Sequence, residues 1–222
     1  MTQFSSLIHH VVTTALSDLG EAQAKGKIPH NPLSETHFLA AWTTNAIKKK
    51  RFDSEVVPTL IIWQRKARSL GKNAGLVQTF KAIKSHYEAV FDEDLKGKVV
   101  NKTQIDAFCQ QLIELDWMVN TDLVVGEKLN RHSAGKASLI ICSDEYEQHI
   151  EKELLIKQLS VYIRGDVKEA LSAAFAHQLL LYKVTDYKSK VKYHGEYIIY
   201  PNNNGTFLPE LLVTDDEQDA SI

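Results

Sequence analysis

The chain has 222 residues, of which 44% are hydrophobic and 24% charged, the mixture of an ordinary globular protein. This length fits one large domain or two small ones and can bury a core without disulfides or metals. The two cysteines, Cys109 and Cys142, form no CxxC pair, which favours buried free thiols in a reducing compartment. Composition therefore argues against a secreted disulfide scaffold and predicts a cytoplasmic protein.

The net charge of −2 hides an uneven distribution. Residues 1–100 carry 14 Lys and Arg against 9 Asp and Glu, a net charge of +5. Residues 101–222 carry 12 against 19, a net charge of −7. This split into a basic and an acidic half is the best functional lead in the sequence.

The N-terminal half is predicted to contain four helices. The first covers about residues 5–25; it has no basic start and no unbroken apolar run, so it is not a signal peptide. No other apolar run approaches the roughly 20 residues that span a bilayer, and we expect no membrane association. The second helix begins at Ser34 as N-cap. The third runs from Pro58 to Gly71, with an apolar stripe of Leu60, Trp63, Ala67 and Leu70. The fourth has the clearest amphipathic pattern of the chain, with Leu76, Phe80, Ile83, Tyr87 and Val90 on its apolar face.

The C-terminal half mixes helices with short strands. Thr103 and Asp106 resemble a capping box at the start of a helix. Short β-branched runs bounded by glycine predict strands at residues 123–125 and 138–141. Ser143 is then expected to cap a helix that extends to about Leu155.

The last part of the chain is predicted to hold one more helix and a turn between strands. Asp166 and Glu169 form a start that resembles a capping box. Residues 202–205, Asn-Asn-Asn-Gly, are a strong turn signal between apolar runs at 197–200 and 207–213. The acidic end of the chain is expected to be disordered.

These elements predict an α+β fold that is predominantly α-helical. Residues 1–95 are expected to form a basic, bundle-like helical half. Residues 99–213 are expected to form an acidic half with helices and a small antiparallel sheet, followed by the tail 214–222. Lys96-Gly97-Lys98 is the predicted boundary, although the two halves could also form one continuous domain.

Basic residues on the predicted helices suggest contact with nucleic acid. Arg65, Arg68 and Lys72 fall at i, i+3 and i+7 on the side away from the apolar stripe, and a short glycine-containing turn follows, as in a helix-turn-helix protein. Against this, charged outer faces keep many helical proteins soluble, and no Asn or Gln cluster marks a base-reading face. The candidate binding residues are Lys48, Lys49, Lys50, Arg51, Arg65, Arg68, Lys72, Lys81 and Lys84.

The titratable clusters carry weaker signals. Glu145, His149 and Glu153 have the i, i+4, i+8 spacing of one helix face, but they lack the ligands that a second helix would supply. We therefore predict no metal and no cofactor. Cys142 is the better candidate nucleophile because it precedes a predicted helix, with His132 or His149 as a possible base. GxSxG, GxxxxGK[ST] and GxGxxG motifs are absent.

Two segments carry a family resemblance: Asn31-Pro-Leu-Ser-Glu-Thr-His-Phe-Leu-Ala-Ala-Trp42 and Ile62-Trp-Gln-Arg-Lys-Ala-Arg-Ser-Leu-Gly-Lys-Asn-Ala-Gly-Leu76. Together they resemble an uncharacterised family of gammaproteobacterial proteins, a domain of unknown function. The resemblance covers about the first 90 residues. It implies a bacterial cytoplasmic protein with an accessory role, and it carries no activity and no site residue.

The leading hypothesis is a non-enzymatic interaction or regulatory module whose basic helical face contacts nucleic acid or an acidic protein surface. One alternative is an enzyme of unidentified type, with a site between the two halves near Cys142, His132 and His149. Another is a homo-oligomer in which basic and acidic halves pair between subunits.

Overall fold

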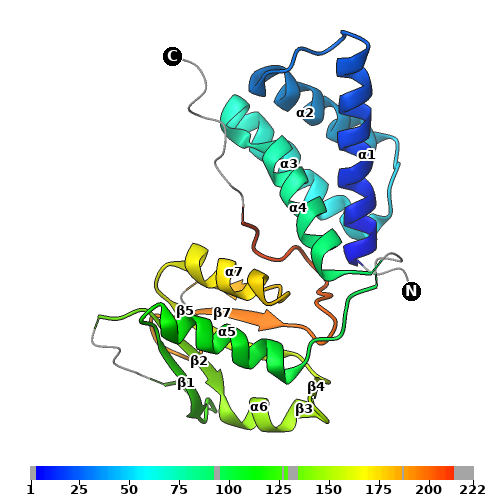
Figure 1. The fold of residues 1–222 in the computed structure, drawn as a ribbon. Coiled ribbons are helices and arrows are strands. Elements are labelled where there is room, and N and C mark those ends of the chain that lie inside the picture. Colours follow the sequence, from blue (N-terminus) through cyan, green and yellow to red (C-terminus); the bar gives the residue numbers. More distant parts are fainter. Residues whose placement is uncertain (1–3, 93–95, 127, 130–134, 187, 213–222) are drawn as a thin grey trace. The chain divides into compact units, whose positions relative to one another are not determined.

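A computed structural model of the chain describes residues 4–92, 96–126, 128–129, 135–186 and 188–212 (Figure 1). The described residues divide into two compact units, one within residues 1–88 (unit 1) and one within residues 89–212 (unit 2). The predicted acidic tail, residues 214–222, lies outside the described residues, and so does His132. No helix among the described residues is long and apolar enough to span a membrane.

Unit 1 is built from four α-helices, as predicted. They are α1 (Phe4–Ala24), α2 (Pro32–Lys48), α3 (Val57–Leu70) and α4 (Leu76–Val90), with 3₁₀ turns η1 (Ser54–Val56) and η2 (Gly71–Ala74) on either side of α3. Gly71 ends α3 with a positive φ of 53°, a conformation that glycine adopts without a Cβ clash.

The predicted cap of α2 is wrong by three residues. Asn31, not Ser34, is the N-cap: its side-chain oxygen accepts a hydrogen bond from the backbone amide of Ser34 at 2.9 Å. Pro32 follows at the first helical position, where its missing N–H costs no helix hydrogen bond. Asparagine and serine cap equally well, so the proline was the signal that could have decided between them.

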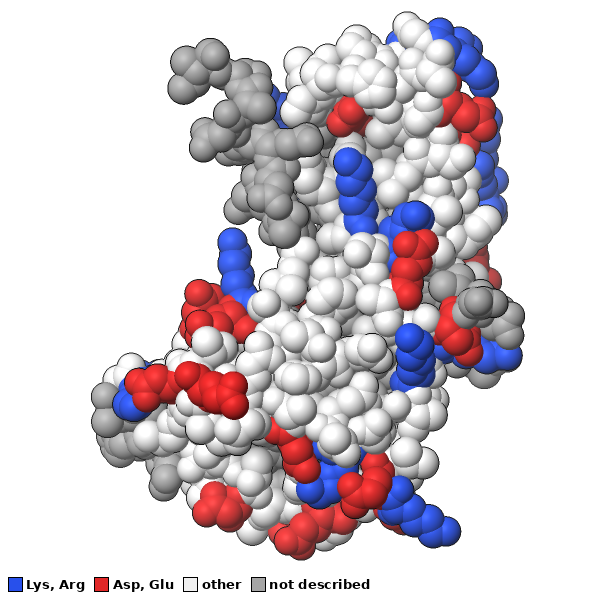
Figure 2. All heavy atoms as spheres, viewed as in Figure 1, with Lys and Arg blue, Asp and Glu red and all other residues white. Residues whose placement is uncertain are grey.

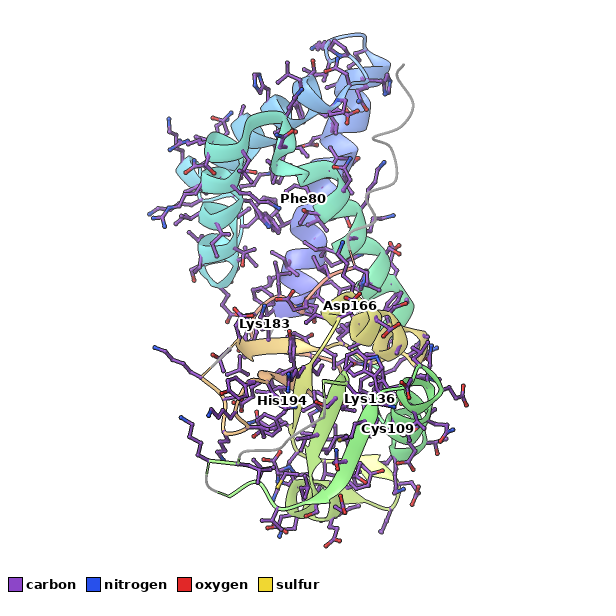
Figure 3. The ribbon with its side chains drawn as sticks, turned by 90° about the vertical axis from the view of Figure 1, so that its left-hand side faces the viewer. Phe80, Cys109, Lys136, Asp166, Lys183 and His194 are labelled. Carbon is purple, nitrogen blue, oxygen red and sulfur yellow. The ribbon has the colours of Figure 1, made fainter. Side chains whose placement is uncertain are left out.

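One face of α4 belongs to the core of unit 1. All five apolar residues predicted for this helix are buried, and Phe80 is fully enclosed, with its ring centroid 4.5 Å from that of Trp63 on α3 (Figure 3). Leu60 and Ala67 extend the buried face of α3 as expected. Leu70 does not, because it is the last residue of the helix and is 49% exposed.

Unit 2 contains a five-stranded sheet in the order β1-β2-β5-β7-β6. The strands are β1 (Met118–Leu123), β2 (Ser138–Cys142), β5 (Leu159–Arg164), β6 (Tyr182–Thr185) and β7 (Gly195–Ile199). β1 and β2 pair in parallel, whereas the other pairs are antiparallel. The helix-rich α+β prediction is therefore confirmed, but the sheet is mixed rather than purely antiparallel. The strand predicted at 123–125 in fact ends at Leu123.

Helices α5 (Lys102–Glu114) and α7 (Val167–Ala176) lie beside each other against this sheet (Figure 1). Phe108 and Leu112 of α5 share one core with Leu139 of β2, Val161 of β5 and Tyr197 of β7. One face of the sheet is thus packed under helices, but β2 is buried along its whole length because its alternate residues enter a second cluster. A second, smaller cluster on other strand positions includes Ile140, Cys142 and Tyr162.

The capping residues of α5 and α7 were predicted with mixed success. α5 starts with a capping box of Asn101 and Gln104 rather than Thr103 and Asp106. Asp106 instead accepts hydrogen bonds from Lys102 and Tyr146. Asp166 is the N-cap of α7, as predicted, and accepts from the Lys168 amide.

The helix predicted from Ser143 to Leu155 is wrong. It ends after six residues as α6 (Ser143–Gln148), and the chain then forms a hairpin of β3 (Ile150–Glu151) and β4 (Leu154–Leu155). Lys152 and Glu153 turn this hairpin with positive φ angles of 48° and 66°. The predicted strand at 207–213 is also absent: its described residues, 207–212, have no regular structure.

A buried histidine links β2 to the loop before β7 (Figure 3). The Nδ1 atom of His194 lies 2.9 Å from the Lys192 carbonyl oxygen, so it must carry the proton. The Nε2 atom is then left to accept from the Ser138 hydroxyl at 2.8 Å. This arrangement satisfies both nitrogens of a neutral imidazole. Burial accordingly lowers the pKa of His194 from its ordinary value of 6.5.

We therefore expect unit 2 to lose stability as the pH falls below about 6.5. In that range His194 binds a proton in the unfolded chain but stays neutral in the folded protein. Chemical denaturation of wild type and His194→Gln at about pH 7.5 and pH 5.5 measures this contribution. Glutamine can still bond to Ser138 but does not titrate, so the stability difference between the two pH values should shrink by up to about 1 kcal/mol. An unchanged difference would show that His194 titrates normally in the fold.

Candidate functional site

The outer face of α3 and the turn η2 present four cations to solvent. Arg65, Arg68 and Lys72 are exposed on the side of α3 opposite its buried residues, as their spacing predicted. Lys66 follows Arg65 and is also exposed, at the flank of this side of the helix, and its position was not predicted. None of the four forms an ion pair with any described residue. We call Arg65, Lys66, Arg68 and Lys72 the α3 cation face.

The carboxylates of unit 1 are mostly engaged elsewhere. Asp18 pairs with Arg51, Glu21 with Lys25, and Glu88 with Lys84. Glu35 accepts a hydrogen bond from Gln23, and Asp53 accepts from the Glu55 amide. Since residues 1–88 carry 12 Lys and Arg against 6 Asp and Glu, the α3 cation face keeps its charge.

Arg51 differs from the other predicted binding residues because it makes contacts within unit 1. Its Nη1 atom lies 3.0 Å from Asp18, and its guanidinium lies 5.3 Å from the Trp42 ring and 5.5 Å from the Phe52 ring. The Trp42 indole donates to the same carboxylate at 2.7 Å. Burial opposes ionisation of Asp18, but the hydrogen bonds from Trp42 and Arg51 bring its pKa below the ordinary value. Arg51 thus ties the end of α2 to α1.

Lys48, Lys49 and Lys50 are exposed where α2 ends and form no ion pair with described residues. Lys48 lies in the last turn, where cations interact favourably with the helix dipole. In Figure 2, the Lys and Arg side chains of unit 1 stand along an edge and at separate points of the face shown, not as one continuous patch.

Helix α4 is poorly suited to read bases. Most of its residues are buried in unit 1, so only a narrow strip including Lys81 and Ser85 faces solvent. A recognition helix needs a broad exposed face to enter the major groove. The α3–η2–α4 connection therefore resembles a helix-turn-helix in the chain order of its parts but not in the exposure of its second helix.

Lys81 and Lys84 instead line a cleft of about 560 Å³ in unit 1. Thr13, Ser17 and Gln23 of α1 contribute polar side chains to its wall, and His30 lies in the loop before α2. The Thr13 hydroxyl oxygen is buried and has no hydrogen-bond partner among the described residues. The sequence indicated the two lysines, but the α1 residues could not be connected with them without the helix packing.

The candidate nucleophile Cys142 is held inside unit 2. It is 4% exposed, and its Sγ atom accepts a hydrogen bond from the Val125 amide at 3.3 Å. His149 is directed elsewhere, with Nδ1 donating to the Gln158 carbonyl at 2.7 Å. Burial also raises the pKa of the second thiol, Cys109, to about 12. Neither thiol has the exposed, electropositive surroundings that activate a cysteine.

The Glu145, His149 and Glu153 triplet does not share a helix face, because α6 ends before His149. Glu145 accepts a hydrogen bond from the Ser160 amide, and Glu153 belongs to the hairpin turn. Within the described parts of the chain, no group of three or more His, Cys, Asp and Glu residues could hold a metal ion.

The fold and the site define a two-unit α+β protein with a basic helical unit 1. A family model described as "Protein of unknown function (DUF2913)" matches residues 3–212, and the chain belongs to this family. The predicted resemblance to an uncharacterised family is thereby confirmed, and it extends well beyond the first 90 residues. No curated protein and no solved structure matches the chain significantly.

Proposed function

We propose that this protein is a non-enzymatic binding module that contacts nucleic acid through the α3 cation face. The observation that supports this most directly is the set of four exposed cations on one helix and its following turn, without ion pairs among the described residues. Cations that are free of internal partners can neutralise phosphates and release the condensed counterions of the polymer.

The expected binding is to the backbone rather than to base edges. α4 has no broad exposed face, and Asn73, which follows Lys72, is the only exposed Asn or Gln of α3 and η2 that could pair with adenine. Phosphate contacts by Arg and Lys fix position but carry no sequence information. We expect similar affinity for unrelated sequences, and a regulatory role would then depend on a further partner.

A cytoplasmic location in a bacterium is part of the same proposal. Both cysteines are free and buried, as in proteins that fold where thiols stay reduced. Nucleic acid is available to a protein in that compartment.

Fluorescence anisotropy with a labelled duplex at low salt tests the proposal on the full chain. The triple variant Arg65→Ala, Arg68→Ala, Lys72→Ala should bind about 100-fold more weakly or worse, because three phosphate contacts are lost. The matched control removes three exposed lysines of unit 2, Lys128, Lys157 and Lys190, and should bind like wild type. Absence of binding by wild type, or equal loss in both triple variants, would refute a role for the α3 cation face.

A further inference from the structure

The cleft of unit 1 has polar groups that the fold itself does not use. α1 and α4 run antiparallel (Figure 1), and His9 Nε2 lies 3.5 Å from Glu88 Oε1 at one end of the pair. One helical turn further along each helix brings Thr13 and Lys84 to the same level, and the next turn brings Ser17 and Lys81. All four residues line the cleft. Two hydroxyl groups on α1 therefore face two ammonium groups on α4.

Two of these groups lack an internal partner. The Thr13 hydroxyl oxygen is buried and unpaired, although buried hydroxyls are normally hydrogen-bonded. Lys81 forms no ion pair with a described residue, whereas Lys84 is 3.4 Å from Glu88. The cleft thus offers one uncompensated positive charge, at Lys81, with the Ser17 hydroxyl group at the same level of α1.

The rest of the cleft suits an apolar body. Leu16, Leu19 and Val77 contribute apolar lining between the two lysines and the far end. There the Gln23 amide donates to Glu35 at 2.7 Å, so a carboxylate closes that end and disfavours a second negative charge on the ligand. A volume of about 560 Å³ is within the range of small-molecule sites.

We propose that this cleft binds a small organic monoanion, with a carboxylate or sulfate head at Lys81 and Ser17 and an apolar body along Leu16 and Val77. The proposal is independent of nucleic-acid binding, because the α3 cation face does not line the cleft. The anion supplies the partner that Lys81 lacks, and the exposed Ser17 hydroxyl, at the same level of the cleft, donates to it.

Isothermal titration calorimetry of the full chain with octanoate, octyl sulfate and neutral octanamide tests this site. At least one of the two anions should bind saturably and octanamide much more weakly; which anion binds identifies the head group. Lys81→Met should weaken binding about tenfold or more, since a charge-assisted hydrogen bond is lost. Lys27→Met, which removes an exposed lysine of unit 1 outside the cleft, should have no effect.

Ser17→Ala provides a second readout. It should weaken anion binding several-fold but leave the melting temperature of the free protein close to that of wild type, because Ser17 is exposed. No saturable binding of either anion, or equal binding of octanamide, would overturn the proposal. So would binding that Lys81→Met leaves unchanged. Duplex binding by Lys81→Met should match wild type, so failure of one proposal does not imply failure of the other.

Discussion

Gly97→Ala is expected to destabilise unit 2 by about 3 kcal/mol or more. A Cβ atom at Gly97 would overlap the carbonyl oxygen of Asn202 and lie 2.8 Å from its carbonyl carbon. These are backbone atoms, so no side-chain rotation relieves the clash, and the two segments must separate. Separation would disturb the bridge between Phe91 and Gly97 and the hydrogen bond from the Val100 amide to Pro201.

Urea denaturation followed by circular dichroism measures this effect. Gly126→Ala is the matched control, because a Cβ there meets no atom within 4 Å and φ is not positive. The control should change stability by less than about 0.5 kcal/mol. A similar small change in Gly97→Ala would contradict the close packing of residues 97 and 202.

Phe80→Ala is expected to cost unit 1 about 3–5 kcal/mol of stability. The Phe80 side chain is fully buried, and its ring packs on Trp63, which holds α3 from the side opposite the α3 cation face. Removing the ring leaves a cavity beneath α3. Nucleic-acid binding should therefore weaken under conditions in which the variant is partly unfolded. Cooling or adding a stabilising osmolyte should restore the binding.

Tryptophan fluorescence during urea denaturation reports this change, because Trp63 loses its ring contact. Ile62→Ala on the same helix is the control: Ile62 is 61% exposed, so its truncation should change stability little. If Phe80→Ala were as stable as Ile62→Ala, the packing of Phe80 in the core of unit 1 would be contradicted.

The helices of unit 1 were predictable because their apolar residues repeat with the helical period. Phe80, Ile83 and Tyr87 indicate the buried face of α4 without any knowledge of what covers it. The hairpin after α6 was not predictable in this way. Ile150 and Leu154 have helical spacing, but Lys152 and Glu153 take left-handed conformations that neither residue type favours. Long-range pairing of Leu155 with Val100 outweighs the local preference.

The candidate sites also divide into features that follow from local sequence and features that depend on the fold. Exposure of Arg65, Arg68 and Lys72 follows from their position opposite the apolar stripe of α3, a purely local property. The ion pair of Arg51, in contrast, is formed with Asp18, which lies 33 residues earlier in the chain. Likewise the cleft requires α1 and α4 to pack together, and no spacing within either helix indicates that partnership.

The salt dependence of duplex binding tests the central claim most directly. Each phosphate contact contributes about 0.9 to the slope of log K against log salt concentration. Replacing Arg65, Arg68 and Lys72 with alanine should therefore reduce the magnitude of the slope by about 2.7 relative to wild type, whereas the unit 2 triple variant should keep the wild-type slope. Equal slopes for wild type and the Arg65, Arg68 and Lys72 variant would contradict phosphate binding by the α3 cation face.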